Sequence, residues 1–218
     1  MRRPNGRART CTTKIDGVKR WGGKPMLMPR PELLDWLAND GWRSEPEAFI
    51  HPFADPEVMA GHGGLGLELL EDLPDLARVL VPVGGGGLIG GVASAIKGVR
   101  PDVEVIGVQS DGYPLWTRAL EVGGPVSITP DTIADGTTAP FDARMLPLMK
   151  EVVDRWLTVP EPRLRAAIPE LAVASKVVAE GAGALAYAAL EQLQPGPATV
   201  AVVSGGNIDS QLLANLLN

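Results

Sequence analysis

Residues 78–97 read RVLVPVGGGGLIGGVASAIK, and this stretch predicts a strand, a tight loop and a helix in succession. The apolar run at its start has the length and β-branched content of a buried strand. Four glycines, Gly84, Gly85, Gly86 and Gly87, end that run, and helix-compatible residues follow. Glycine adopts positive φ freely and leaves the backbone open to a ligand, and the first N–H groups of a helix favour an anion. We therefore expect a phosphate on these four residues.

The glycine loop is compatible with more than one ligand. Gly85, Gly87 and Gly90 fit the G-x-G-x-x-G pattern of dinucleotide-binding proteins, and Asp111, after the next predicted strand, would then bind the ribose hydroxyls of a nicotinamide cofactor. Four consecutive glycines also form a wider nest of N–H groups, which suits a single phosphate. A packing turn without a ligand is the third interpretation. No Gly-Lys-Ser/Thr follows the glycines, which excludes a P-loop.

Predicted strands and helices alternate along most of the chain. Strands that are apolar on both faces and separated by helices indicate an α/β fold with an open, mostly parallel, twisted sheet and helices on both faces. The predicted strands are 25–28, 47–53, 79–83, 103–110, 155–160 and 198–203. The predicted helices include 14–23, 31–40, 55–73, 161–179 and 180–190. Residues 123–143 show no periodicity, and so long a loop is usually functional or mobile.

Composition and charge exclude several classes of protein. The chain has 218 residues, 45% of them apolar, and a formal net charge of −6, which argues against non-specific nucleic-acid binding. A single cysteine, Cys11, excludes an internal disulfide, and no His/Cys cluster has zinc-ligand spacing. No apolar run is long enough to span a membrane, so we expect a cytoplasmic protein.

A second glycine turn, SGGN at residues 204–207, follows the last predicted strand. The carboxyl ends of parallel strands line the ligand crevice of an open sheet, so Ser204 is a candidate ligand contact. A serine in this place could instead be the N-cap of the final helix.

The motifs VPVGGGGLIGGVA, TIADG, AEGAGALA and VVSGGNID, in this order, resemble the fold-type II pyridoxal-phosphate enzymes, in particular the threonine and serine dehydratases and serine racemases. HPFADPEVMAG belongs to the same resemblance, which extends from about residue 14 to near the last residue. It implies pyridoxal 5'-phosphate as cofactor and the dehydration and deamination of serine or threonine to a 2-oxo acid and ammonia. It also implies an incomplete small-domain remnant (14–46) and a cofactor-binding large domain (47–218). The basic composition of residues 1–13 predicts a disordered tail.

The resemblance also assigns roles to individual residues. The N–H groups of the four glycines would hold the cofactor phosphate, and Ser204 would face the pyridine nitrogen. A neutral hydroxyl there makes the cofactor a weaker electron sink than a carboxylate would, which favours β-elimination. Glu180 would lie near the ring, and Gly136 would approach the ring's substituents with its backbone. Asp135 is interpreted as a turn former.

The sequence departs from the family in its first part. Neither the Ser-Phe-Lys segment, whose lysine forms the Schiff base, nor the Ser-x-Gly-Asn turn occurs, so no catalytic residue is identified. Lys14 fits a later helix motif and is interpreted as a surface lysine. We therefore expect an N-terminally truncated member of the family. It would be an enzyme known from a truncated reading frame or complemented by a second, N-terminal half, or a non-catalytic pseudoenzyme that binds the cofactor or a phosphate. A nicotinamide-dependent oxidoreductase is the weaker alternative.

Further expectations concern metals, partners and histidines. Some relatives carry an acidic cation ligand where this chain has Gln109, so no metal site is expected. The two histidines, His51 and His62, have no carboxylate or cysteine partner in the sequence pattern and are interpreted as structural. The resemblance implies a small amino acid as substrate and a homo-oligomer, a dimer, if no complementing half is present.

Overall fold

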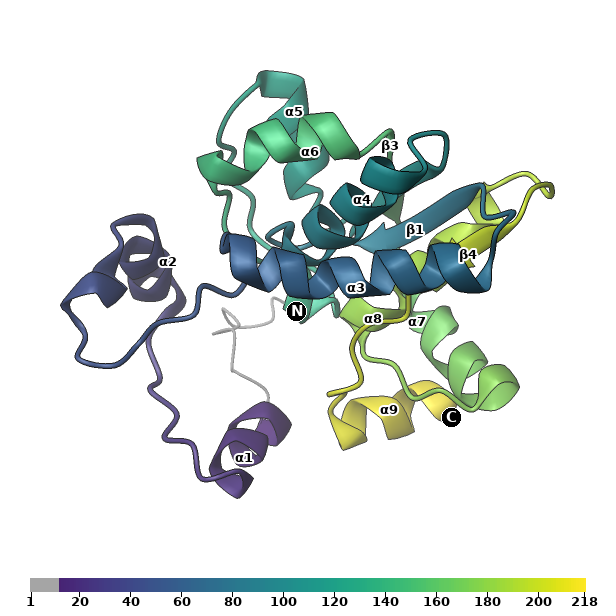
Figure 1. The fold of residues 1–218 in the computed structure, drawn as a ribbon. Coiled ribbons are helices and arrows are strands. Elements are labelled where there is room, and N and C mark those ends of the chain that lie inside the picture. Colours follow the sequence, from purple (N-terminus) through teal and green to yellow (C-terminus); the bar gives the residue numbers. More distant parts are fainter. Residues whose placement is uncertain (1–11) are drawn as a thin grey trace. The chain divides into compact units, whose positions relative to one another are not determined.

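A computed structural model describes residues 12–218 (Figure 1). Its internal contacts divide the described chain into two units. One unit consists of residues 12–49 and 207–218, and the other is Ile50–Gly206. The second unit contains the glycine loop and the sheet.

The sheet of Ile50–Gly206 has four parallel strands in the order β3-β2-β1-β4. They are β1 (Arg78–Pro82), β2 (Glu104–Ser110), β3 (Arg155–Val159) and β4 (Thr199–Ala201). Leu80 lies opposite Ile106 on one side and Ala201 on the other, which sets the register. The predicted open, parallel sheet is therefore confirmed. The strand order reverses at β1, and ligands of such sheets bind at the carboxyl ends of the strands at this switch point.

Helices cover both faces of the sheet because its central strands are apolar on both sides. Val79, Val81 and Val105 belong to the core that includes helix α4, whereas Leu80 and Ile106 alternate with them and point to the other face. There α8 contacts β1, β2 and β3. The helices of this unit are α3 (Pro56–Asp72), α4 (Gly87–Val99), α5 (Leu115–Val122), α6 (Leu146–Val152), α7 (Glu161–Glu170) and α8 (Gly181–Ala189). Short 3₁₀ turns are η2 (Asp135–Thr137), η3 (Ala143–Met145) and η5 (Leu190–Gln192).

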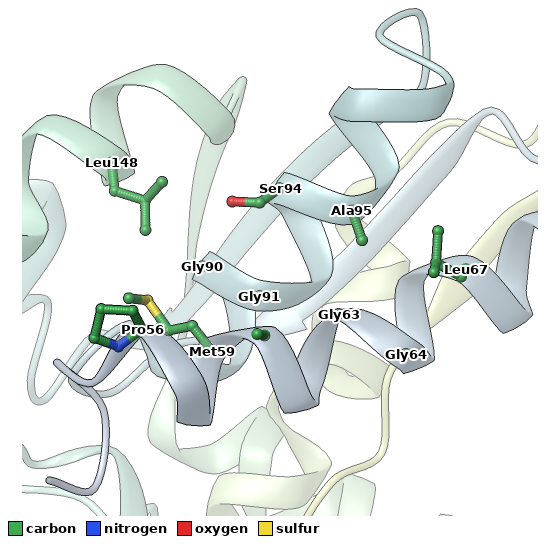
Figure 2. A pocket seen from close by; sticks show the side chains of 11 residues that line it. Pro56, Met59, Gly63, Gly64, Leu67, Gly90, Gly91, Ser94, Ala95 and Leu148 are labelled. Atoms are coloured by element: carbon green, nitrogen blue, oxygen red, sulfur yellow. The ribbon is translucent and has the colours of Figure 1, made fainter.

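Helices α3 and α4 pack closely because glycines line their contact. A Cβ on Gly91 would overlap the carbonyl oxygen of Met59, and one on Gly66 would lie 2.6 Å from the carbonyl oxygen of Val92. The glycines of both helices therefore allow the two backbones to approach each other closely. Beside this contact lies an apolar hollow of about 520 Å³, which Leu148 of α6 also lines (Figure 2). No titratable side chain lines it.

Replacing Gly91 by alanine is expected to lower the free energy of unfolding by about 2 kcal/mol, because the added methyl group must push the α3 backbone away. Chemical denaturation measures this change. Gly98→Ala is the matched control in the same helix, since nothing lies within 4 Å of its Cβ position. It should be neutral or stabilising, as alanine favours a helix over glycine. Equal stability of both variants would contradict the close packing.

Three sequence predictions about strands were wrong. Residues 25–28 and 47–53 are not strands, and the second segment instead turns at His51 before α3. The predicted buried strand at 198–203 is shorter, and β4 is a half-buried strand at the edge of the sheet.

The predicted helix at 161–179 also ends early. After α7 comes a π-helical segment, η4 (Leu171–Ser175), and Lys176 then adopts a left-handed conformation with φ of 59°. Pro169 lacks the N–H that a regular helix needs at that position, which accounts for the irregular turns nearby.

The other unit carries the predicted helices α1 (Thr12–Arg20) and α2 (Arg30–Ala38), which are confirmed, together with η1 (Gly41–Ser44) and α9 (Ser210–Leu217). Trp36, Trp42 and Phe49 form an aromatic cluster with ring centroids 4.8 to 5.9 Å apart. Trp21, directly after α1, is 88% exposed. No helix between residues 12 and 218 has the length and apolarity needed to cross a bilayer.

Candidate functional site

The glycine loop lies at the carboxyl end of β1, at the switch point of the sheet. Gly85, Gly86 and Gly87 are buried, and Gly86 takes a φ of 102°, which strongly favours glycine. Within residues 12–218, no hydrogen bond from the N–H groups of the four glycines to another residue is found. Buried N–H groups normally have a partner, so this loop fits an anion that accepts hydrogen bonds from them.

Two backbone carbonyls at the start of the loop, in contrast, are bound by buried side chains. The Trp116 indole Nε1–H donates to the carbonyl of Gly84 over 2.8 Å, and the Gln109 amide Nε2 donates to that of Val83 over 3.4 Å. Gln109 Oε1 also accepts from the backbone N–H groups of Trp116 and Thr117 at the start of α5. These contacts occupy the carbonyls and leave the N–H groups for a ligand. The sequence alone did not indicate this role for either side chain.

Behind the loop, large side chains fill the space that side chains on the glycines would need. A Cβ on Gly85 would overlap the ring of Phe53, and one on Gly87 would lie 2.7 Å from the Cα of Phe53. A Cβ on Gly86 would meet the sulfur of Met149 at 3.2 Å. The close approach of Phe53 explains why glycine is needed here, apart from any ligand. Phe53 belongs to the motif HPFADPEVMAG, but no role could be assigned to it there, because its role depends on a contact between distant segments.

The TIADG segment lies directly beside the glycine loop. A Cβ on Gly84 would be 2.9 Å from the Cα of Thr137 and 3.3 Å from the carbonyl oxygen of Gly136. The carboxylate of Glu161, in the first turn of α7, accepts hydrogen bonds from the Thr132 hydroxyl at 2.9 Å and the Ile133 N–H at 3.0 Å. Glu161 thereby anchors this segment, a role that sequence reasoning missed.

Glu180 and the second glycine turn meet the TIADG segment. A Cβ on Gly136 would lie 3.5 Å from Glu180 Oε1, and one on Gly205 would overlap the same carboxylate. The Glu180 N–H donates to the Gly205 carbonyl over 2.8 Å. The structure thus brings Gly84, Gly136, Glu180 and the 204–206 turn into one contiguous site.

Ser204 is exposed and lies next to Gly205 in this turn. It is not the N-cap of the final helix, because α9 begins at Ser210 and Asp209 caps it by accepting from the N–H groups of Gln211 and Leu212. That alternative interpretation was wrong. Asp135 is exposed in the 3₁₀ turn η2, which agrees with a turn former.

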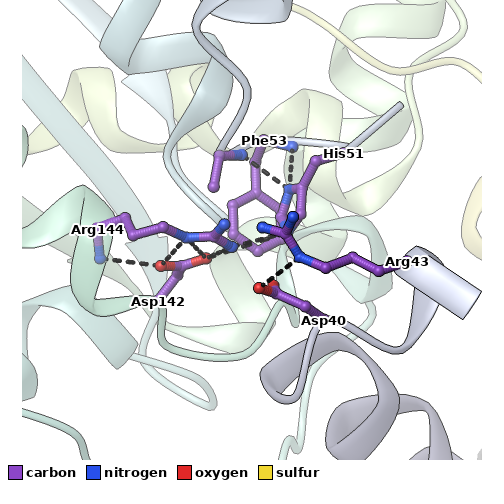
Figure 3. A network of polar contacts seen from close by, with 7 residues as sticks. Asp40, Arg43, His51, Phe53, Asp142 and Arg144 are labelled. Atoms are coloured by element: carbon purple, nitrogen blue, oxygen red, sulfur yellow. Dashed lines mark hydrogen bonds and ion pairs between the residues drawn. The ribbon is translucent and has the colours of Figure 1, made fainter. Parts of the chain in front are cut away.

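His51 has a carboxylate partner that the sequence pattern did not indicate. Its Nε2 lies 4.0 Å from Asp142 Oδ2, and Arg144 binds the same carboxylate (Figure 3). Burial of Asp142 opposes its ionisation, but hydrogen bonds from the side chain and backbone of Arg144 outweigh this, so the pKa of Asp142 lies below its ordinary value. Ninety-one residues separate the two side chains in the chain, so no local pattern could reveal the pair.

The lowered pKa predicts a pH-dependent contribution of Asp142 to stability. A carboxyl group whose pKa is lower in the folded chain stabilises the fold above its unfolded pKa of about 3.9, and the contribution is lost as the pH falls through the folded value. Asp142→Asn should therefore be less stable than the wild type at pH 7, and the difference should shrink below about pH 4. Urea denaturation at several pH values measures it. Asp111→Asn, at an exposed aspartate, is the control.

No cluster of three or more His, Cys, Asp or Glu side chains that could hold a metal ion occurs within residues 12–218. The amide of Gln109 is only 1% exposed and is bound to backbone groups on both sides.

Comparison with known proteins identifies the family to which the chain belongs. The chain belongs to the family described as "Pyridoxal-phosphate dependent enzyme", which matches residues 9–205. Its fold and the glycine loop at the switch point are those of a fold-type II member, as predicted from the motifs. Family membership removes the support for a nicotinamide cofactor on Asp111.

Several individual relatives and solved structures are similar to this chain. Over 175 residues the chain is 46% identical to an L-threonine ammonia-lyase of Thermotoga maritima, covering 78% of this chain and 43% of the relative. It is 42% identical to the catabolic L-threonine dehydratase of Escherichia coli, covering 76% of this chain and 52% of the relative. Among solved structures, threonine deaminase isoform 2 from Solanum lycopersicum superposes with a TM-score of 0.79 at 31% identity, covering 95% of this chain and 59% of that one. Maize serine racemase superposes with a TM-score of 0.80 at 27% identity, covering 93% and 66%. The chain spans about half the length of the curated relatives it matches.

Proposed function

We propose that the glycine loop binds the phosphate of pyridoxal 5'-phosphate through the N–H groups of Gly84, Gly85, Gly86 and Gly87. The observation that carries this proposal is the set of loop N–H groups that have no acceptor among residues 12–218, at the switch point of a sheet from this family. The site fits the group because Trp116 binds the carbonyl of Gly84 and Gln109 that of Val83 just before it, while the loop N–H groups point to no such partner among residues 12–218. The loop therefore presents donors and few acceptors, as a phosphate requires.

Three other residues complete the proposed cofactor site. Gly136 leaves space beside Glu180, so that a flat ring can approach the backbone there. The Glu180 carboxylate, half-buried between Gly136 and Gly205, would take part in the hydrogen bonds around the ring. Ser204, exposed next to Gly205, would place its hydroxyl at the pyridine nitrogen. A neutral hydroxyl there holds no charge that would stabilise a protonated ring.

We propose further that the complete protein deaminates serine or threonine, as the names of its relatives indicate. Pyridoxal phosphate supplies an electron sink that acidifies the Cα–H of a bound amino acid. The residues of this chain would bind and orient the cofactor and, through Phe53 and Thr137, exclude water from the back of the loop. None of the residues placed at the site is a lysine, so the proton acceptor would come from another polypeptide segment, in a second half-chain or in a dimer.

An absorbance titration of the purified chain with pyridoxal phosphate, before and after borohydride and followed by peptide mass spectrometry, tests this proposal. Saturable binding without a reduced adduct would support a cofactor site that lacks its lysine, as in a pseudoenzyme or half-enzyme. A reduced adduct on one lysine would show that this chain supplies the covalent link itself. Absence of saturable binding would contradict the proposal. Binding of NAD in place of pyridoxal phosphate would support the oxidoreductase alternative.

A further inference from the structure

His51 is buried close to the glycine loop and makes contacts that the proposed function does not use. The residue is 6% exposed, and its Nδ1 accepts hydrogen bonds from the backbone N–H of Ala54 at 2.9 Å and of Phe53 at 3.4 Å (Figure 3). Pro52, between His51 and Phe53, has no N–H of its own. The imidazole therefore closes the turn that leads from residue 51 into α3.

These contacts determine the tautomer of His51. Because Nδ1 accepts a backbone N–H, the neutral ring carries its proton on Nε2. Nε2 faces the Asp142 carboxylate at 4.0 Å. Arg144 Nη2 lies 3.3 Å from the same nitrogen, but a guanidinium only donates, so with the proton on Nε2 this contact is not a hydrogen bond. Arg144 is itself bound to Asp142 at 2.6 Å. A negative carboxylate beside Nε2 favours a proton there, so Asp142 and the backbone of residue 54 select the same tautomer.

The turn closed by His51 places Phe53 behind the loop. The two rings meet edge to face, with centroids 4.6 Å apart and an interplanar angle of 88°. Phe53 is 7% exposed, and its ring and Cα occupy the space behind Gly85 and Gly87. A change in the turn would therefore move the surface on which the loop backbone rests.

We propose that His51 is a positioning residue for the anion-binding loop. Its Nδ1 atom holds the turn at residues 51–54, this turn holds Phe53, and Phe53 fixes the backbone of Gly85 and Gly87 with their N–H groups toward the ligand. The inference rests on the proposed function for its effect on cofactor binding. Its structural part, the effect of His51 on the loop, is independent of any cofactor.

Two substitutions of His51 distinguish the roles of its two ring nitrogens. Asparagine places an amide oxygen near the position of Nδ1, so His51→Asn keeps the acceptor for the Ala54 N–H. Glutamine reaches the position of Nε2 and loses that acceptor. We expect His51→Gln to weaken the affinity for pyridoxal phosphate about tenfold, as expected for a buried N–H left without a partner. His51→Asn should retain most of the affinity. His62→Gln, at the other histidine, is the matched control and should bind as the wild type does.

Each result of this experiment decides the inference. Equal affinities of the wild type and both His51 variants would overturn it, and so would a loss in His51→Asn as large as that in His51→Gln. If the wild-type chain binds no pyridoxal phosphate, the proposed function fails. The positioning role is then tested by the NMR chemical shifts of the Gly85 and Gly87 amides, compared with those of the wild type. Changed shifts in His51→Gln but not in His51→Asn support it, and unchanged shifts in both variants overturn it. Nitrogen chemical shifts of wild-type His51 give a test that needs no variant, since a proton on Nδ1 would also overturn the inference.

Discussion

Replacing Gly86 by aspartate is expected to reduce the affinity for pyridoxal phosphate by about a hundredfold or more, equivalent to about 3 kcal/mol. Gly86 has a φ of 102°, and a side chain in this region of backbone space is strained by about 1–2 kcal/mol. Its Cβ would also meet the methyl group of Met145 and the sulfur and methyl group of Met149 at 3.2 to 3.4 Å. The new carboxylate would in addition repel the phosphate dianion. Titration followed by absorbance measures the loss.

Gly123→Asp is the matched control for this substitution. Gly123 also has a positive φ, 72°, but it lies at the C-cap of α5 with nothing within 4 Å of its Cβ position. Aspartate tolerates this backbone conformation better than most residues do, so the control should fold and bind normally. Wild-type affinity in Gly86→Asp would place the phosphate elsewhere and remove the main support for the proposed cofactor site.

Replacing Gln109 by methionine, which has a similar length, should lower the free energy of unfolding by about 3 kcal/mol. The change removes the acceptor for the N–H groups of Trp116 and Thr117 and the donor to the Val83 carbonyl, all at a position that is only 1% exposed. Each buried polar group left without a partner costs about 1–3 kcal/mol, and rearrangement recovers part of this cost. Thermal or chemical denaturation measures the change.

Gln192→Met provides the control for Gln109. The Gln192 amide donates one hydrogen bond, to the Thr158 carbonyl over 2.9 Å, but at an exposed position where water can replace it. We expect a change of about 0.5 kcal/mol or less there. If the two variants were equally stable, Gln109 would not hold α5 and the glycine loop together.

Much of the fold could be predicted from local patterns. The apolar run before Gly84 predicted β1, and the helix predicted over 55–73 is α3. Its start follows from local chemistry, since Asp55 Oδ1 caps it by accepting from the Glu57 N–H at 2.8 Å and Pro56 fits the first turn. The same reasoning was wrong for residues 47–53. Their apolar pattern is typical of a strand, but the imidazole of His51 binds the backbone N–H groups that a strand would have used in a sheet.

The candidate site, too, could be predicted only in part from the sequence. The sequence alone determined the parallel α/β fold and the glycine loop after β1, because hydrophobic period and glycine content are local properties. The family resemblance singled out Gly136, Glu180 and Ser204 as candidate site residues. Only the tertiary structure decided that Phe53 supports the loop, that Gln109 and Trp116 bind two carbonyls at its start, and that Asp142 faces His51. These are contacts between segments far apart in the chain. Their partners become neighbours only when the sheet and its covering helices assemble.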